Sequence, residues 1–372
     1  MMNNFKLLKS CRNRLVGITL FTILAIISSG CSKLGSYSIK AGRGAYNEAI
    51  NYTDAQQTLM TIVRHRYGEK STILAVTSVT ANVSVTSKVG FNIGIGSKEN
   101  FEGNLVPLSG GVVYEENPTI TYAPVQGREY IRKLLSPIPI ELLALTISSE
   151  LSPEEMGKLI IFLISRVNDI KNPAFLSAKN SLSDPRFLRY VDLTVLLVSS
   201  GNLFFISSQD IPNKYAFVIT DYKSSVDEVQ EFLNILGISK QIKMFEDIVL
   251  PINFAIHKSD SPGISLKTRS IWDLVQILGS TIQLPEDNEL SENAIKYPPP
   301  GLPTMNLKIL SSKQKPINAA VQINYNRNWY YIDRNDKQTK TAFRILQEFW
   351  GVMIADASKG SLMAPVLTVP VN

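Results

Sequence analysis

Oxygen-bearing side chains are closely spaced in YYIDRNDKQTK, residues 330–340, where Asp333, Asn335 and Asp336 fall within four consecutive positions. Calcium takes six to eight oxygen ligands, but an EF-hand loop also needs a glycine at its sixth position and a glutamate at its twelfth. Both are missing. Paired carboxylates can also hydrolyse glycosides, although residues three apart in a turn rarely face each other across a cleft. We expect Asp336 to cap the following helix through its first backbone amides, with a ligand site as the alternative.

His65 and His257 are the only histidines available as a general base or as zinc ligands. Arg64 and Arg66 flank His65, and their charges disfavour its protonation. The motifs G-x-S-x-G and H-E-x-x-H are absent, and the glycines of GFNIGIG lack the strand–loop–helix context of a phosphate cradle. We therefore expect both histidines to be structural, and the sequence predicts no catalytic residue, no metal site and no cofactor.

Arg64, His65 and Arg66 form a basic triplet at the end of a predicted helix. Thr53 and Gln56 make a T-x-x-Q capping box at its start, and apolar residues then recur at helical spacing until a glycine ends the helix. The helix dipole favours positive charge at this end, so a solvated helix end explains the triplet. The alternative is a contact with acidic lipid headgroups or with a partner.

The stretch IISSGCSKLG, residues 26–35, places Cys31 directly after an apolar run. A basic segment without acidic residues, the apolar run Leu15–Ile27 and the small residues Ser28, Ser29 and Gly30 have the layout of a secretory signal peptide. A permanent transmembrane helix needs about 20 apolar residues, which this run does not reach. The sequence therefore predicts an exported protein.

A cysteine at this place resembles the lipobox of bacterial lipoproteins, which implies that the thiol of Cys31 is acylated and that Cys31 becomes the first mature residue. Two or more acyl chains anchor a protein stably. Ser32 follows, and a residue other than Asp at this position is typical of outer-membrane sorting in that family. Ser28 departs from the lipobox pattern, so an ordinary signal-peptidase cut that leaves a free thiol is the alternative.

Removal of the signal changes the charge balance of the chain. There are 38 Lys and Arg against 32 Asp and Glu, and four of the bases lie in residues 1–30, which leaves 34 against 32. This balance excludes a generally basic nucleic-acid-binding protein. Cys11 is removed as well, so the mature chain can form no internal disulfide and no cysteine-based zinc site. A chain of about 340 residues can bury an adequate core without them.

Helical and strand patterns alternate along the mature chain. A period of two predicts an antiparallel strand pair with one wet face over residues 73–96. Capping signals followed by proline open helices after Ser152 and Asp184, and a further helix is expected to be capped by Ser225. The segments PTITYAP, NLFFISS, KYAFVITDY and DIVLPINFAI are expected to be strands, and residues 128–135 a helix.

A strand, a polar step and a helix recur in GISLKTRSIWDLVQILG, WYYIDRNDKQTKTAFRILQEFWG and, more loosely, TITYAPVQGREYIRKLL. We interpret this as a weak structural repeat without a fixed period. In the second segment, Trp329 and Tyr331 share a strand face by period two and are expected to pack on the following helix. That helix should bury one face, made of Phe343, Leu346, Phe349, Trp350 and Met353.

These patterns predict an α+β fold with antiparallel or mixed sheets and helices packed against them, in two lobes. The expected organisation is a lipoprotein signal peptide at 1–30, a polar tether at 31–42, a main body at 43–296, a stiff proline-rich connector, YPPPGLP, at 297–303, and a C-terminal strand–strand–helix unit at 304–372.

The segment GRGAYNEAINYTDAQQTLMTIVRHRYGEKSTILAVTSVTA resembles a set of uncharacterised proteobacterial lipoproteins. Four further segments are similar in the same order: PTITYAPVQGREYIRKLLSPIP, ISLKTRSIWDLVQILG, NWYYIDRNDKQTKTAFRIL and APVLTVPV. Together they cover about a third of the chain. The resemblance implies an exported, lipid-anchored protein facing the periplasm of a Gram-negative bacterium, and it implies no activity.

The sequence thus favours a non-enzymatic envelope protein, held in the outer membrane by acylated Cys31, that acts as a scaffold or adaptor for protein partners of a periplasmic or outer-membrane assembly. A ligand-binding lipoprotein with a cleft between the lobes, around the 297–303 connector, is the first alternative, and its single deep pocket would contain convergent polar groups. An envelope hydrolase that uses carboxylates such as Asp333 and Asp336 is the second alternative.

Overall fold

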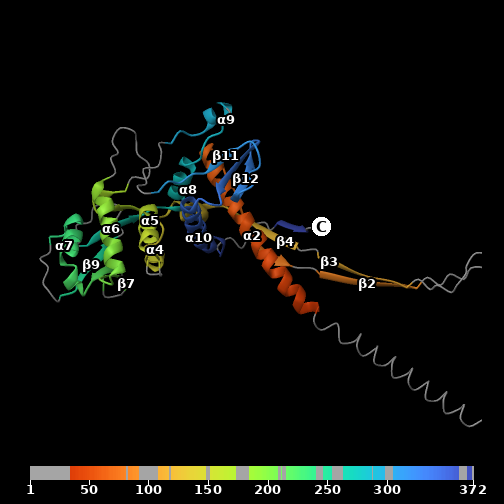
Figure 1. Ribbon diagram of the computed structural model, residues 1–372, viewed down its shortest axis with the longest axis horizontal. Coiled ribbons are helices and arrows are strands. Elements are labelled where there is room, and N and C mark those ends of the chain that lie inside the picture. The colour runs from red at the N-terminus through yellow and green to blue at the C-terminus, as the bar shows by residue number, and fades with distance from the viewer. Residues whose placement is uncertain are drawn as a thin grey trace, which may run out of the picture. The chain divides into compact units, whose positions relative to one another are not determined.

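The computed structural model describes most of the chain beyond the N-terminal segment (Figure 1). The described residues are 34–80, 83–91, 108–116, 119–147, 151–172, 184–207, 211, 215–239, 246–253, 263–286, 288–297, 305–359 and 367–370. The chain divides into two compact units: the first contains residues 1–53, 76–122 and 367–372, and the second contains residues 54–75 and 123–366. These boundaries differ from the predicted connector at 297–303, of which only Tyr297 is described.

A two-stranded ribbon is the largest strand pairing of the first unit. β2 (Val83–Phe91) and β3 (Leu108–Glu116) pair antiparallel along their whole length. β1 (Ile73–Thr80), β4 (Thr119–Val125) and β14 (Leu367–Pro370) form a three-stranded sheet with β4 in the middle. The two strands described within residues 73–96, β1 and β2, therefore do not pair with each other as predicted, and residues 92–96 of the predicted pair lie outside the described residues. Both strands form, but each finds its partner later in the chain, which period-two patterns do not specify.

α2 (Leu34–Arg66) is a single helix of 33 residues. The expected tether at 31–42 is thus helical from its fourth residue onward. Thr53 does not begin a helix, because it lies in the interior of α2. Its hydroxyl donates to the backbone carbonyl of Ile50, three residues earlier. The side chain of Gln56 donates to the carbonyl of Gln322 at 3.0 Å instead of closing a capping box.

Six strands form the main sheet of the second unit, in the order β6-β5-β10-β9-β8-β7. Their bounds are Ile164–Val167 for β5, Ile170–Lys171 for β6, Leu203–Ser207 for β7, Tyr215–Ile219 for β8, Ile248–Asn253 for β9 and Ile264–Thr268 for β10. Neighbouring strands run antiparallel except β9 and β10, which are parallel. The sheet is therefore mixed, as the sequence predicted.

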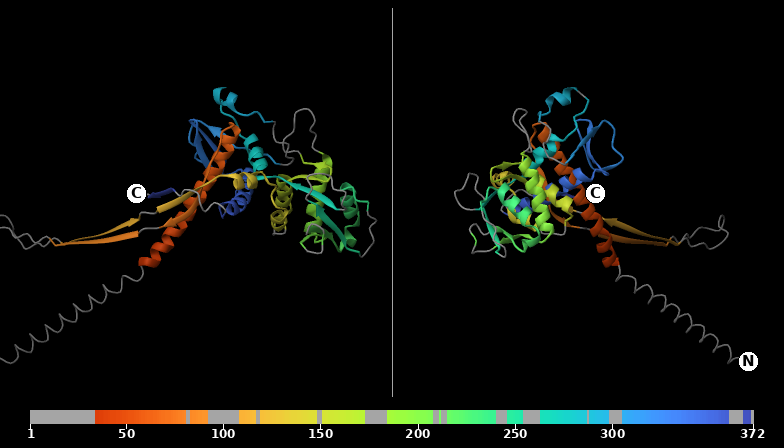
Figure 2. Two further views of the ribbon diagram at one scale, coloured as in Figure 1. Left: turned by 180° about the vertical axis from the view of Figure 1, so that it is seen from behind. Right: turned by 60° about the vertical axis from the view of Figure 1, so that its left-hand side comes forward.

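One face of this sheet is buried against helices. Period two separates the two faces, and the buried side carries Val167, Leu203, Ile219, Leu250, Ile252, Ile264 and Leu266, each at most 5% exposed. α6 (Pro185–Ser199) and α7 (Val226–Ile235) lie side by side (Figures 1 and 2). The rings of Tyr190 on α6 and Phe232 on α7 stack with centroids 5.7 Å apart.

Two of the three predicted helix caps in this unit are confirmed. Ser152 accepts from the amide of Glu155 and Glu155 reciprocates, which makes the capping box of α5 (Pro153–Leu163). Asp184 accepts from the amide of Arg186 at the start of α6. Ser225 precedes α7 as predicted, but its side chain makes no cap bond and donates instead to Asn202 at 3.2 Å. The hydroxyl that was predicted to cap α7 is therefore bonded to a neighbouring loop instead.

The helices of the three recurring segments pack on one another. α3 (Arg128–Leu135), α8 (Ile271–Ser280) and α10 (Lys337–Lys359) are in mutual contact. A second antiparallel sheet has the order β11-β13-β12, with β11 at Leu310–Ser312, β12 at Ala319–Tyr325 and β13 at Asn328–Asp333. The remaining described elements are α4 (Ile140–Ile147), the short 3-10 helix Tyr222–Ser224 and α9 (Asn288–Asn293).

The predicted buried face of α10 is confirmed, since all five residues named for it are at most 6% exposed. The predicted strand face of β13 is wrong by one residue. Tyr330 and Ile332 are fully buried, whereas Trp329 and Tyr331 are half-buried on the other side of the strand. The ring of Trp329 is instead covered by the ammonium of Lys315, 5.5 Å from the ring centroid.

A buried arginine links β10 to the end of α5. Arg269 is 2% exposed, and its Nη1 donates to the carbonyls of Ile161 and Phe162 at 2.6 Å each, while Nη2 donates to the carbonyl of Asn172 at 3.2 Å. The last carbonyls of a helix lack intrahelical partners and carry partial negative charge. The guanidinium therefore caps the C-terminal end of α5, a role that no glycine fills here.

The α+β fold class is confirmed. Among the described residues, no helix has both the length and the apolar character needed to cross a membrane.

Candidate ligand pocket

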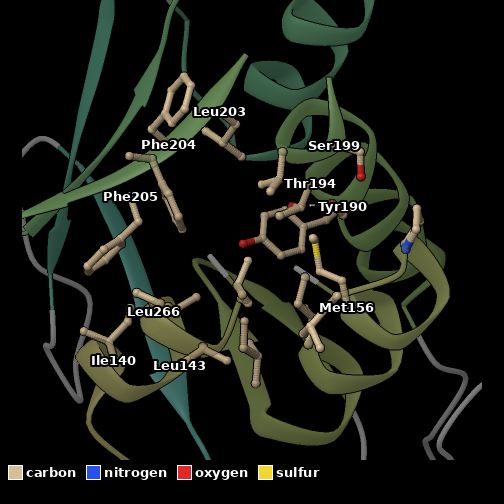
Figure 3. Close-up of a pocket in the computed structure, with 18 residues that line it drawn as sticks. Ile140, Leu143, Met156, Tyr190, Thr194, Ser199, Leu203, Phe204, Phe205 and Leu266 are labelled. Atoms are coloured by element: carbon tan, nitrogen blue, oxygen red, sulfur yellow. Dashed lines mark hydrogen bonds between the residues drawn. The ribbon is translucent and has the colours of Figure 1, made fainter. Parts of the chain in front are cut away.

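A cavity of about 560 Å³ lies between the buried face of the main sheet and helices α4, α5 and α6 (Figure 3). The residues that line it are Ile140, Leu143, Ala144, Ile147, Leu151, Pro153, Met156, Ile160, Ile164, Tyr190, Thr194, Val198, Ser199, Leu203, Phe204, Phe205, Phe217 and Leu266. Ligand pockets in proteins commonly measure 300–1,000 Å³ and are mainly apolar with a few placed polar groups. The size and lining of this cavity fit that description.

Parts of three helices and of strand β7 shape the pocket. α4 presents Ile140, Leu143 and Ala144 from its buried side. Pro153 at the first position of α5 fixes the entry of that helix. The pocket extends to β7, which pairs only with β8 among the described strands.

The pocket has a buried floor and an exposed rim. Met156 and Leu203 on the floor are at most 4% exposed. Pro153, Ser199 and Phe204 are exposed and lie at the rim. A ligand can therefore place most of its surface on the floor and leave one end near solvent.

Tyr190 supplies the single phenol of the floor. Its side chain is 1% exposed, and Figure 3 shows its hydroxyl directed into the cavity. Burial raises the pKa of Tyr190 to about 12, against a smaller opposite effect of the Thr194 hydroxyl, so the phenol stays protonated at neutral pH. Thr194 donates to the backbone carbonyl of Tyr190 at 2.7 Å. The phenol is thus a neutral group that can donate one hydrogen bond to a ligand.

No charged side chain belongs to the eighteen residues that line the pocket. Transferring an unpaired charge into such surroundings is costly. The pocket therefore suits a neutral molecule, or a neutral apolar part of a larger one. Comparisons of the chain with protein-family models, with curated proteins and with solved structures found no match. The geometry alone carries the assignment of this site.

Sequence reasoning did not find this pocket. Its lining comes from helices and strands spread over residues 140–266, and most of these residues read as ordinary core positions. Tyr190 occupies an apolar position of α6 and carries no local signal in the sequence.

The candidate ligand turn at Asp333, Asn335 and Asp336 lies outside the pocket. Asp336 accepts from the amide of Thr339 at 2.9 Å and from its hydroxyl at 2.6 Å. Asp333 accepts from the amide of Asn335 at 2.7 Å. The predicted cap by Asp336 is confirmed. The carboxylates make the local bonds of a turn and helix start, and no group of His, Cys, Asp and Glu that could hold a metal is found among the described residues.

The basic triplet is turned largely toward protein. Arg66 is 6% exposed, and its guanidinium lies 5.2 Å from the ring centroid of Tyr297. His65 packs edge-on against Trp272 at 4.5 Å, and Nε2 lies 3.1 Å from the hydroxyl of Tyr297. Burial lowers the pKa of His65. This arrangement agrees with a structural His65. The expected solvated helix end is wrong, because Arg66 is buried. The exposed contact surface that was the alternative for Arg64, His65 and Arg66 is not present either.

The proposed anchor Cys31 and the second histidine, His257, lie outside the described residues.

A second, shallower groove of about 440 Å³ runs between α4, α5 and α10. Leu145 and Val352 line it and are 65% and 48% exposed. Arg344 and Glu348 also line it and form an ion pair at 2.8 Å. This groove is an exposed apolar surface with a charged border.

Proposed function

We propose that this protein is a lipid-anchored envelope protein whose second unit binds a neutral, hydrophobic small molecule in the pocket between α4, α5, α6 and the main sheet. The uncharged cavity of about 560 Å³ is the observation that carries the binding function. The layout of residues 1–31 supports export and acylation at Cys31. Ligand binding was the first alternative from the sequence, although the pocket is lined by residues 140–266 and not by the 297–303 connector, and it is mainly apolar where convergent polar groups were expected. The pocket nevertheless favours ligand binding over the scaffold.

The ligand class follows from the lining. A volume of this size fits a molecule with a skeleton of drug or fatty-acyl size. The floor offers aliphatic and aromatic surface and one phenol, so the preferred ligand has an extended apolar body and one hydrogen-bond acceptor that meets Tyr190. Its polar end, if it has one, lies at the rim near Ser199.

The test uses the neutral fluorophore N-phenyl-1-naphthylamine with the purified full chain and with two variants of α6. Ser199→Trp places an indole at the exposed rim and is expected to reduce probe binding at least tenfold. Leu196→Trp is the matched control, because Leu196 is 48% exposed on the same helix and does not line the pocket. Both substitutions lie at exposed positions and should leave the unfolding midpoint unchanged.

A parent chain that binds no probe, or two tryptophan variants that bind it equally well, would contradict the proposal. Tyr190→Phe adds a second criterion. It should leave binding of the apolar probe unchanged and weaken a ligand that carries a ketone or ester acceptor, by the loss of one hydrogen bond.

The scaffold or adaptor function is the second candidate, and the groove between α4, α5 and α10 favours it. Exposed apolar surface bordered by charge is typical of protein–protein contacts. Leu145→Glu and Val352→Glu should release envelope proteins that copurify in mild detergent, whereas Ser199→Trp should not. The reverse pattern would assign the copurifying partners to the pocket.

A further inference from the structure

The aromatic side chains of the ligand pocket lie on one side of it. Phe205 on β7, Phe217 on β8 and Tyr190 on α6 line the cavity. None of the lining residues on α4 or α5 is aromatic. Figure 3 shows Phe205 and Tyr190 above the cavity and Ile140 and Leu143 below it. The pocket therefore has an aromatic side, to which β7, β8 and α6 contribute, and an aliphatic side formed by α4 and α5.

The rings from the sheet form a fixed wall. Phe205 lies directly opposite Phe217 in the strand register, so both side chains point to the same face of the sheet. Their centroids are 6.1 Å apart in an edge-to-face arrangement. The other neighbour of Phe205 is Tyr215, whose ring stacks on it at 5.5 Å and whose hydroxyl donates to Glu141 at 3.3 Å. A ligand thus meets aromatic surface that is already positioned, which lowers the cost of ordering it on binding.

Tyr190 places a hydrogen-bond donor beside this wall. Its hydroxyl is directed into the cavity on the side of Phe205 (Figure 3). Since the phenol is protonated at neutral pH, it can donate to an uncharged acceptor such as a carbonyl oxygen. A carboxylate is a poor alternative, because the lining residues include no cation to pair with it.

A flat ring gains more from the aromatic side than a flexible chain does. Offset and edge-on contacts between rings contribute beyond the area that they bury, by about two- to tenfold in affinity. A carbonyl group on such a ring lies in the plane of the ring, at the level of the contact with the wall. Ring and donor therefore favour the same kind of molecule.

We propose that the ligand is a lipid whose head is a planar ring with a carbonyl group, of the kind found in quinones. The ring lies against Phe205 and Phe217, its carbonyl accepts from Tyr190, and an aliphatic tail follows the side formed by α4 and α5. This inference rests on the proposed function, because it names the ligand class of the same pocket. It assigns binding and no redox step.

The test measures dissociation constants by equilibrium dialysis of the purified full chain with two neutral ligands. The first, 2,3-dimethyl-1,4-naphthoquinone, is a flat ring with carbonyl groups. The second, methyl undecanoate, has the same numbers of carbon and oxygen atoms in a flexible chain. Phe217→Leu keeps an apolar side chain and removes the ring, so it should weaken binding of the naphthoquinone about threefold or more and that of the ester by less than about twofold.

The matched control is Ile147→Ala, which removes apolar surface from the aliphatic side of the same pocket. It should change binding of the naphthoquinone by less than about twofold, because the ring does not need that side. Tyr190→Phe should weaken the naphthoquinone about two- to tenfold and leave 2,3-dimethylnaphthalene, which has no carbonyl group, unchanged. Phe205→Leu repeats the test if Phe217→Leu lowers the unfolding midpoint.

The outcomes separate this inference from the proposed function. A parent that binds N-phenyl-1-naphthylamine but not the naphthoquinone would overturn the ring and leave the apolar pocket standing. Equal losses of naphthoquinone binding in Phe217→Leu and Ile147→Ala would also overturn it. An equal loss of ester and naphthoquinone binding in Phe217→Leu would identify an acyl lipid as the ligand class instead. A parent that binds none of these molecules would contradict the proposed function as well.

Discussion

Replacing Arg269 by methionine tests whether its guanidinium holds the end of α5 to β10. Methionine keeps most of the apolar volume of the side chain and removes the donors. Burial lowers the pKa of Arg269 to about 10, with the charge of Asp273 acting in the opposite direction, so the group remains charged at pH 7. The variant therefore removes a buried cation and its three hydrogen bonds together.

The magnitude follows from the carbonyls that lose a donor. Ile161 keeps the side-chain amide of Asn172 at 2.7 Å, but Phe162 and Asn172 lose the bonds that Arg269 gives them. A buried polar group left without its partner costs about 1–3 kcal/mol, so two cost about 2–6 kcal/mol. Burying the guanidinium itself is unfavourable, and its removal offsets part of this loss. We expect Arg269→Met to lower the free energy of unfolding by about 3 kcal/mol.

Urea unfolding followed by circular dichroism measures this change. Arg344→Met is the matched control, because Arg344 is 60% exposed and pairs with Glu348 on the helix surface. Exposed pairs contribute at most about 1 kcal/mol, so the control should lose less than that. If Arg269→Met costs no more than Arg344→Met, the bonds to α5 do not stabilise the fold and the reasoning is wrong.

Three further predictions concern other buried and half-buried groups. Because burial lowers the pKa of His65, the unfolded state binds more protons below its ordinary value near 6.5; the parent should lose stability relative to His65→Gln as the pH falls from 7.5 to 5, and a constant difference would contradict this. The hydroxyls of Tyr67 and Tyr330 lie 2.7 Å apart, so each phenylalanine variant should cost about 1 kcal/mol, and a double-mutant cycle should give a coupling of at least about 0.5 kcal/mol rather than additivity. Asp336→Ala should lower the stability by about 1 kcal/mol through loss of the α10 cap while Asp336→Asn retains it, and a calcium-dependent rise in melting temperature would instead favour a ligand site.

Local sequence signals predicted helix starts and strand positions well where the partner group is near in the chain. Ser152, Asp184 and Asp336 each accept a hydrogen bond from an amide two or three residues later, as the sequence indicated. The capping box at Thr53 failed because the preceding residues continue the same helix. The hydroxyl of Ser225 failed as a cap because it donates to the distant Asn202.

Strand pairing and the pocket depend on contacts that a local pattern does not contain. The predicted buried face of β13 was wrong by one residue, because the four consecutive residues from Trp329 to Ile332 are all aromatic or aliphatic. The sequence pattern therefore fits burial of either alternate pair. In the sequence, Tyr190 is an ordinary helix residue and Arg269 a basic residue of a loop. Their roles depend on distant segments, which form the pocket around Tyr190 and the end of α5 beside Arg269. Long-range burial, rather than composition, gives these side chains their roles.

Tyr190 connects the pocket to the packing of the second unit, because its ring stacks on α7 while its hydroxyl faces the cavity. A molecule that binds only the folded chain stabilises it by mass action, by about 2.7 kcal/mol at a hundred times its dissociation constant. Occupied and empty copies would then differ in how often this region opens to a protease. The cellular lifetime of the protein would thereby report the supply of its ligand.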